Sequence, residues 1–342
     1  QYPFVRHELL HPEVPLDVEL EAFTPFIPLD ADRSGIPVAI MTWSITNRDT
    51  QPRSVSVAAS MANITNHQGY DVFSKPLYGE DQVNETFTEE GIQGIRFRQT
   101  TLTEAHHRYM EMGLALADSP EGEIALRPNW AEGQWWDGVQ DFWNDFSDDG
   151  QLDPESEVEE NVYSIHHSPF KIGSVARKHI LQPGETAEWR FLITWYRPNR
   201  IKSWNQNLPP IEPDSAEPLH EHARPLIRNY YAHWGNPLAV SRYVTANYDE
   251  LYGLSRAFAD ALYSSTLPEP VIDAVASTLT VIRSTTCARV EGGRFYAFEG
   301  CFDHEGACHG NCSHVWNYAQ TLAYLFPELE RSMRRTEFLE EV

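Results

Sequence analysis

One carboxylate, Glu299, stands at the end of an aromatic strip and just before a loop rich in cysteine and histidine. The strip consists of Phe295, Tyr296, Ala297 and Phe298, so apolar neighbours limit the hydration of the Glu299 carboxylate and restrict its movement. A glycosidase nucleophile needs a fixed, ionised carboxylate of this kind beneath the anomeric carbon of the sugar. The alternative interpretation is an ordinary glutamate at the end of a strand or loop.

A cluster of possible zinc ligands follows Glu299. Six cysteine and histidine side chains lie within 14 residues: Cys301, His304, Cys308, His309, Cys312 and His314. Thiolate and imidazole are the ligands that zinc prefers, but this spacing matches no standard finger or ribbon. Buried thiols with polar loop histidines, or a local disulfide between Cys308 and Cys312, are the alternatives. A zinc-stabilised interaction module at residues 301–314 is therefore one hypothesis, with Cys301, Cys308, Cys312 and His314 as its ligands.

The charge balance limits the possible partners. The chain of 342 residues has 26 Lys and Arg against 50 Asp and Glu, a formal charge of −24, so nucleic acid and anionic membranes would be repelled. Aromatic residues make up 12% of the chain, with 10 Trp and 15 Tyr. Their flat faces suit the C–H faces of sugars, although a large β-rich core also uses them.

The cysteine pattern and the lack of long apolar runs indicate a soluble chain and leave its compartment open. All four cysteines lie between Cys287 and Cys312, so no disulfide framework spans the chain. No signal peptide pattern is present, and no run approaches the ~18 apolar residues of a membrane-spanning helix. A soluble, cytoplasmic protein is the favoured interpretation.

The secondary structure predicted for the chain that must hold Glu299 changes from strands to helices along the sequence. Up to residue 200, short alternating runs such as residues 17–23 and 37–45 predict strands. A turn at residues 181–186 leads into a long alternating strand at 187–195, a pattern typical of the end of a β-sandwich. We expect an antiparallel β-sandwich domain over residues 1–200 and a linker over residues 201–225.

After the linker the apolar residues recur at helical spacing. Helices are predicted over residues 226–234, 239–258, 271–282 and 315–335. The sequence thus indicates a β domain followed by an α domain, over residues 226–342, that begins but does not finish a helical fold. Within the β part, Asp145 to Gly150 partly imitates a calcium loop, but an acidic surface turn is favoured. Trp135, Trp136 and Trp143 could line a sugar cleft or pack a hairpin.

Three segments around Glu299 resemble glycoside hydrolase family 116, which includes non-lysosomal glucosylceramidases and bacterial β-glucosidases. They are Phe-Tyr-Ala-Phe-Glu-Gly at 295–300, Cys-His-Gly-Asn-Cys-Ser-His-Val-Trp-Asn-Tyr at 308–318, and Leu-Phe-Pro-Glu-Leu-Glu-Arg at 325–331. Residues 18–29 and 193–199 are similar to the first domain of the family. The resemblance covers nearly the whole chain.

The resemblance implies an N-terminal β-sandwich packed on an (α/α)6 toroid, of which this chain holds only the first helices. It also implies retaining hydrolysis of β-linked glucosides without a metal or organic cofactor. Glu299 would be the nucleophile, and His314, Trp316 and Asn317 would contact the sugar. Glucosylceramidase-type members carry an Asp shortly before the helix, where this chain has Cys312, Ser313 and His314.

The acid/base of the family is an Asp far beyond the nucleophile, so we expect it to be absent from this chain. The resemblance therefore predicts a fragment of a retaining β-glycosidase whose partner is a β-glucoside or glycolipid substrate. A carbohydrate-binding or structural protein without catalysis is the alternative from another class.

Overall fold

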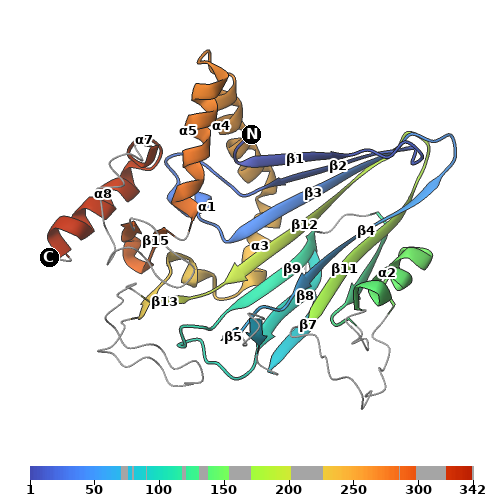
Figure 1. Cartoon of the computed structure of the whole chain (residues 1–342), viewed down its shortest axis with the longest axis horizontal. Coiled ribbons are helices and arrows are strands. Elements are labelled where there is room, and N and C mark those ends of the chain that lie inside the picture. Colours follow the sequence, from blue (N-terminus) through green and yellow to red (C-terminus); the bar gives the residue numbers. More distant parts are fainter. Residues whose placement is uncertain are drawn as a thin grey trace.

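The computed structural model describes residues 1–70, 76–78, 81–89, 91–117, 121–130, 138–153, 171–201, 226–284, 286–297 and 321–340. Within these ranges, antiparallel strands fill most of the first 200 residues, and most of the helices follow them (Figure 1). The strands of this region are β1 (Phe4–Leu9), β2 (Leu16–Phe23), β3 (Val38–Asn47), β4 (Arg53–Ala62), β5 (His67–Tyr70), β6 (Pro76–Tyr78), β7 (Gln82–Glu89), β8 (Ile92–Gln99), β9 (Glu111–Ala117), β10 (Glu123–Arg127), β11 (Ile172–Leu181) and β12 (Thr186–Tyr196).

Two of the sheets among the described residues face each other across a core. The large sheet has the strand order β1-β2-β3-β12-β9-β8-β7, and the small sheet has the order β10-β11-β4. Side chains from the large sheet, such as Trp189, Phe191 and Phe97, pack with Val55 and Val175 of the small sheet. The alternating strands predicted at 17–23, 37–45 and 187–195 are confirmed as β2, β3 and β12, and the arrangement agrees with a β-sandwich followed by helices.

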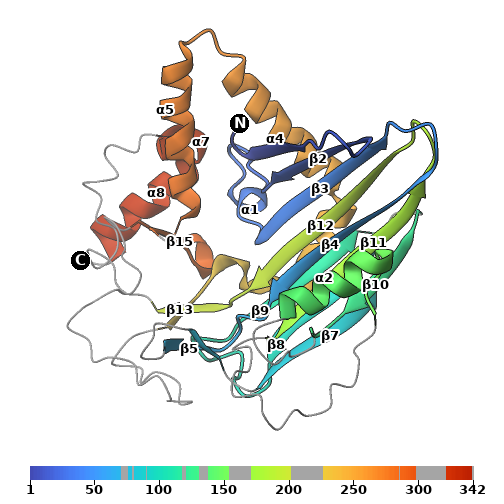
Figure 2. The ribbon, with the colours of Figure 1, turned by 45° about the vertical axis from the view of Figure 1, so that its right-hand side comes forward.

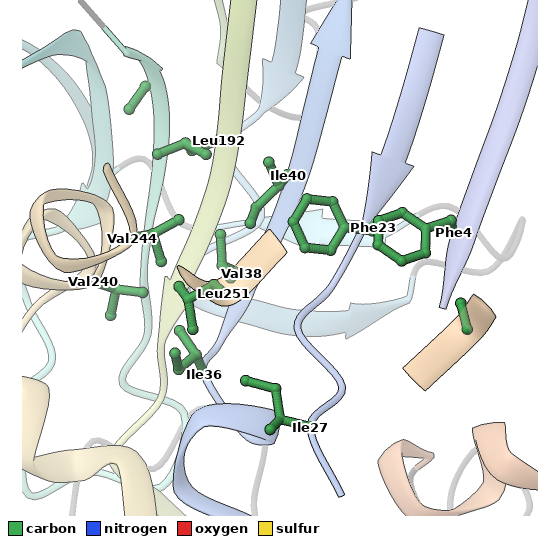
Figure 3. Close-up of a cluster of buried hydrophobic side chains, with 12 residues drawn as sticks. Phe4, Phe23, Ile27, Ile36, Val38, Ile40, Leu192, Val240, Val244 and Leu251 are labelled. Atoms are coloured by element: carbon green, nitrogen blue, oxygen red, sulfur yellow. The ribbon is translucent and has the colours of Figure 1, made fainter. Parts of the chain in front are cut away.

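The large sheet is covered on its second face as well. Helices α3 (Pro237–Ala246) and α4 (Tyr248–Tyr263) contribute Val240, Val244 and Leu251 to a second core, which they share with Ile40 and Leu192 of the sheet (Figure 3). Because both faces of its central strands are buried, a strand such as β9 is apolar on both sides. The helices and the sheet therefore form one packed body.

The remaining elements lie around this body (Figure 2). They are α1 (Ala31–Ser34), α2 (Gly138–Asp149), β13 (Asn199–Ile201), β14 (Leu226–Arg228), the 3-10 turn η1 (Tyr230–Trp234), α5 (Glu269–Leu279), the 3-10 turns η2 (Thr280–Arg283) and η3 (Glu291–Gly293), β15 (Cys287–Arg289), β16 (Phe295–Ala297), α7 (Thr321–Leu325), α8 (Pro327–Arg335) and the π-helical turn η4 (Thr336–Glu340). Helix α2 lies over the small sheet, and α5, α7 and α8 lie at the opposite side (Figure 2). Among the described helices, none combines the length and apolar character needed to cross a bilayer.

Two of the helix predictions were wrong in detail. Residues 226–234 form β14 and η1, because the backbone N–H of Asn229 donates to the Pro198 carbonyl at 2.7 Å. The helix predicted over 239–258 is divided at Asn247, whose side-chain amide donates to the Tyr243 carbonyl at 2.8 Å. At residues 226–234 a tertiary hydrogen bond thus replaces the helical ladder. At Asn247 the backbone N–H still donates to the Tyr243 carbonyl at 3.0 Å, and the division lies in the dihedral angles of Asn247, φ of −117° and ψ of 18°.

The last predicted helix is also divided. Pro327 is the first residue of α8, and α7 ends two residues before it, because proline suits a helix start better than its interior. The part of that prediction over residues 315–320 lies outside the described residues.

The segment from Asp145 to Gly150 is the end of α2 and not a surface turn. Gly150 follows the helix with φ of +78°, and its N–H donates to the Phe146 carbonyl at 2.9 Å. Asp145 pairs with Arg127 of β10 at 2.8 Å, which holds α2 against the small sheet. Trp143 on α2 is 57% exposed, and Trp135 and Trp136 lie outside the described residues.

Candidate functional site

A short antiparallel hairpin leads directly to the residue that the sequence favours as a nucleophile. Strands β15 and β16 pair in register, with Cys287 opposite Ala297 and Arg289 opposite Phe295. All three residues of β16 are buried. Cys287 and Ala297 form the open end of the hairpin, and Ala297 comes two residues before Glu299 in the sequence. The chain that enters the candidate site is therefore held by a strand that is inaccessible to water.

Helix α8 fastens the hairpin from one side. The hydroxyl of Ser332 accepts a hydrogen bond from the Phe295 N–H at 3.2 Å and donates one to the Gly293 carbonyl at 2.9 Å. Around these bonds lies a third core that combines Phe295 and Ala297 with apolar side chains of α7 and α8, namely Leu322, Leu329 and Met333. Both polar and apolar contacts thus fix the hairpin on the helices that follow it in the chain.

The loop between β2 and β3 fastens the same region to the large sheet. Arg283, at the end of η2, donates to the carbonyls of Pro25 at 3.0 Å and of Ile36 at 3.3 Å. In the same loop, the N–H of Leu29 donates to the Leu325 carbonyl at 2.7 Å. Two backbone segments of the sandwich are therefore bonded to the elements on either side of the hairpin.

Phe26 carries this loop into the third core. It is buried, and its ring meets Phe326 edge-to-face at a centroid distance of 5.3 Å and Tyr2 at 5.0 Å. Burial raises the pKa of the Tyr2 phenol to about 12, against the opposing effect of the Arg283 charge. The contact around Phe26 is consequently apolar and largely dehydrated.

The candidate catalytic and sugar-binding residues Glu299, His314, Trp316 and Asn317 lie outside the described residues, as do the candidate zinc ligands Cys301, Cys308 and Cys312. The structure brings the flanks of this segment together, since β16 before it and α7 after it share one core. Both ends of the undescribed segment are thereby anchored to one scaffold.

A different group of possible metal ligands occurs in the sandwich. One oxygen or nitrogen atom from each of Glu121, His179 and Glu185 lies within 4.8 Å of the others. Glu185 is already engaged, because its carboxylate accepts from the Gln182 N–H at 2.6 Å and lies 3.4 Å from His179 Nε2. The hydrogen bond from Gln182 and the charge of His179 lower the pKa of Glu185. These contacts account for Glu185 and His179, two of the three side chains in the cluster.

No feature of the sequence marks Arg283 and Ser332 as residues that hold the hairpin in place. Ser332 lies within the helix predicted over 315–335, and Arg283 directly follows the helix predicted over 271–282. Each bonds a backbone carbonyl far away in the chain. The aromatic run of η1, which contains Tyr230, Tyr231 and Trp234, did have a signal in its density of rings. The spacing of these rings predicts only a helix.

The comparison with known families agrees with the architecture. The family model described as "beta-glucosidase 2, glycosyl-hydrolase family 116 N-term" matches residues 1–251, which include the whole sandwich, α3 and the start of α4. No curated protein matches the chain. The matched region covers well over half of the 342 residues, and the elements within it form the two-faced large sheet described above. The chain therefore belongs to glycoside hydrolase family 116, and its first 251 residues correspond to the N-terminal region of that family.

Proposed function

We propose that this chain is the sandwich and the first toroid helices of a retaining β-glycosidase. Its substrates are β-glucosides, including glucosylceramide-like glycolipids. The observation that carries the proposal is the match of the family model to residues 1–251. The aromatic strip before Glu299, with its strand buried in the third core, supports the assignment of the reacting group.

Glu299 is the proposed nucleophile. Its carboxylate oxygen forms a bond to the anomeric carbon, the bond from that carbon to the leaving oxygen breaks, and a second carboxyl group protonates the leaving oxygen. Water then attacks the anomeric carbon, the second group accepts the proton of the water, and the bond from the carbon to the Glu299 carboxylate breaks. Two successive inversions retain the configuration at the anomeric carbon. The two groups must lie about 5 to 5.5 Å apart for this double displacement.

The anchoring of β16 supports this role. A nucleophile gains from a rigid approach, because effective catalysis requires the reacting atoms to be held near the attack geometry. Ala297, two residues before Glu299, has no exposed surface. We assign sugar contacts to His314, Trp316 and Asn317, which follow Glu299 and precede α7 in the sequence.

We assign the second carboxyl group to further helices that would complete the toroid. The described helices carry apolar side chains on open faces: Val271 and Val275 on α5, Tyr324 on α7, and Phe338 and Leu339 in η4. Apolar side chains that gather on one side of a protein usually mark a contact surface. Packing of further helices on these faces would cover them.

Covalent labelling tests the assignment of Glu299. The probe is 2-deoxy-2-fluoro-β-D-glucosyl fluoride, whose fluoride leaves with the bonding electrons and needs no general acid. We expect a glycosyl adduct on the peptide that contains Glu299, detected by mass spectrometry, and no adduct in Glu299→Gln. The matched control is Glu269→Gln, an exposed glutamate at the start of α5, which should label like the original protein.

A second measurement tests the need for the other carboxyl group. The purified 342-residue chain should release little or no glucose from an unactivated alkyl β-glucoside, because we assign the group that protonates the leaving oxygen to a further segment. Robust hydrolysis by this chain would overturn the assignment of the acid/base to a further segment. An adduct on a residue other than Glu299 would overturn the assignment of the nucleophile.

A further inference from the structure

A pocket of about 470 Å³ lies where the sandwich meets the helices, and we call it the junction pocket. It is lined by α1, η1, α3 and the turn from Arg289 to Gly293. Its volume is within the range of small-molecule sites. Two of the elements that contribute lining residues, α1 and β15, are labelled in Figure 2. The turn that lines it is the closed end of the hairpin, whereas Ala297 and the approach to Glu299 are at the open end.

Aromatic rings form one wall of the junction pocket. Trp234 lies 5.0 Å from Tyr243 between ring centroids, with an angle of 59° between the planes, and 5.0 Å from the ring of His233. Trp234 is only partly buried, and its other contacts are with the second core. A tilted group of partly exposed rings offers a flat apolar surface with polar edges, which suits the alternating C–H and O–H faces of a sugar.

The charges of the junction pocket cancel. Its lining includes the carboxylates of Asp32 and Glu291 and the guanidinium groups of Arg33 and Arg289. Arg289 is paired with Asp32 at 2.6 Å, and Arg33 is paired with Glu250 at 2.6 Å. Both cations already face carboxylates, in a chain of net charge −24. The pocket consequently favours a neutral ligand over a phosphate or another anion.

Exposed polar groups at the rim can bind hydroxyls. The Asp32 side chain is 82% exposed and the Glu291 side chain 70% exposed, so both carboxylates keep accepting positions open to solvent. His233 Nδ1 lies 2.9 Å from the Tyr230 carbonyl, which can only accept, so this nitrogen carries the proton. In the neutral imidazole, Nε2 is then an acceptor for a hydroxyl group.

We propose that the junction pocket is a sugar-binding site that takes one or two β-linked glucose units and performs no chemistry on them. Trp234 stacks on the apolar face of a ring, while Asp32, His233 and Glu291 accept hydrogen bonds from its hydroxyls. Such a site holds a glycan on the protein independently of the reaction. The choice of β-glucosides as ligands rests on the proposed function, whereas the pocket and its chemistry do not.

Calorimetric titration with cellobiose tests the proposal, with Trp234→Ala as the main variant. Loss of the stacking surface should weaken binding about tenfold. Trp143→Ala is the matched control, because Trp143 is an exposed tryptophan on α2, the helix that packs on the small sheet. This variant should bind cellobiose like the original protein. Equal affinity of the original protein and Trp234→Ala would overturn the proposal.

A second variant keeps the test valid if Trp234→Ala is unstable, since Trp234 also packs on the second core. His233→Ala with Glu291→Gln changes two exposed groups and should weaken cellobiose binding severalfold while leaving the thermal unfolding midpoint unchanged. Unchanged affinity for cellobiose in this double variant would contradict the proposed hydrogen bonds from the sugar hydroxyls to His233 and Glu291. Stronger binding of inorganic phosphate than of cellobiose would identify an anion site and overturn the proposal.

The two proposals fail separately. Glu299→Gln should retain the cellobiose binding that depends on Trp234, because the junction pocket contains no part of the nucleophile. Absence of a glycosyl adduct together with Trp234-dependent binding would contradict only the proposed catalysis. An adduct at Glu299 together with unchanged binding in Trp234→Ala would contradict only the junction pocket.

Discussion

The hydroxyl of Ser332 bonds the Phe295 N–H at 3.2 Å and so connects α8 to the strand that leads to Glu299. The same oxygen donates to the Gly293 carbonyl at 2.9 Å, so one side chain satisfies a donor and an acceptor of the hairpin. These residues are 37 positions apart, and the undescribed segment with Glu299 lies between them. The bond therefore connects the described elements that precede and follow Glu299 in the sequence.

Ser332→Ala should lower the free energy of unfolding by about 1 kcal/mol, because two hydrogen bonds to partly buried backbone groups are lost. It should also slow the labelling of Glu299 by the fluoroglucoside, since β16 becomes less restrained. Chemical denaturation and the rate of adduct formation measure the two effects.

The control for this variant is Ser277→Ala. The Ser277 hydroxyl donates to the Ala274 carbonyl at an exposed position of α5, so its loss should change stability by less than about 0.5 kcal/mol. Equal stability and equal labelling rate in Ser332→Ala and Ser277→Ala would contradict the positioning role of Ser332.

Leu251 tests the packing of α4 on the large sheet. It has no exposed surface and lies in the core shared with Ile40 and Leu192, so Leu251→Ala should cost about 2 to 5 kcal/mol of unfolding free energy. The control on the same helix is Leu254→Ala, which removes a side chain that is 38% exposed and should cost much less. Urea denaturation followed by circular dichroism measures both, and a similar loss in the two variants would contradict the shared core.

Strands were predictable where apolar and polar side chains alternate along the chain. In β2, for instance, Asp17, Glu19 and Glu21 alternate with apolar residues. The residues of β9 from Glu111 to Ala117 are all buried, so alternation is lost there and local sequence cannot assign a face. The packing of α3 on that face depends on the tertiary structure and cannot be predicted from the sequence of β9.

The candidate site was predictable only in part. The sequence marks the proposed nucleophile, but it does not mark the residues that position the hairpin before it. Glu299 stands out by its aromatic neighbours, which are adjacent in sequence. Arg283 and Ser332 act through carbonyls of Pro25 and Gly293, and no local pattern connects those positions. The rings of the junction pocket were visible as an aromatic run at 230–234, but their grouping with α1 depends on the fold.

A substitution at Gly94 tests the close approach of β8 and β9. A Cβ atom at this position would lie 2.1 Å from the Leu114 carbonyl oxygen and 2.8 Å from the Ala115 Cα, both backbone atoms that cannot move aside. Gly94→Ala should therefore separate the two strands and destabilise the sandwich by more than about 2 kcal/mol. A measured loss below that of an ordinary surface substitution would contradict this strand contact.

Gly253→Ala is the opposite case and serves as the control. Gly253 lies within α4, and a Cβ atom there would meet nothing within 4 Å. Since alanine restricts the unfolded chain and favours a helix, this variant should stabilise the protein by about 0.5 to 1 kcal/mol. Thermal melting of Gly94→Ala and Gly253→Ala should thus give shifts of opposite sign.

Ionisation of Tyr196 should lower the free energy of unfolding at alkaline pH. Its hydroxyl donates to Glu104 Oε1 at 2.8 Å, and the pKa of the phenol is raised to about 12 by burial and by the hydrogen bond and charge of Glu104. The folded state holds this proton more tightly than the unfolded state, whose tyrosines have a pKa near 10. The resulting stabilisation is complete below pH 10 and is lost as the pH rises from 10 to 12.

Tyr196→Phe isolates this effect. The original protein should exceed the variant in unfolding free energy by about 1 to 2 kcal/mol near pH 8, a value reduced from the full pKa difference because Glu104 is half exposed. Urea denaturation between pH 8 and pH 11.5 should show this difference falling as the pH rises above 10. Tyr324→Phe, at a side chain that is 79% exposed, should leave stability unchanged across the range. A difference between the original protein and Tyr196→Phe that stays constant to pH 11.5 would contradict the raised pKa and with it the burial of the Tyr196 hydroxyl beside Glu104.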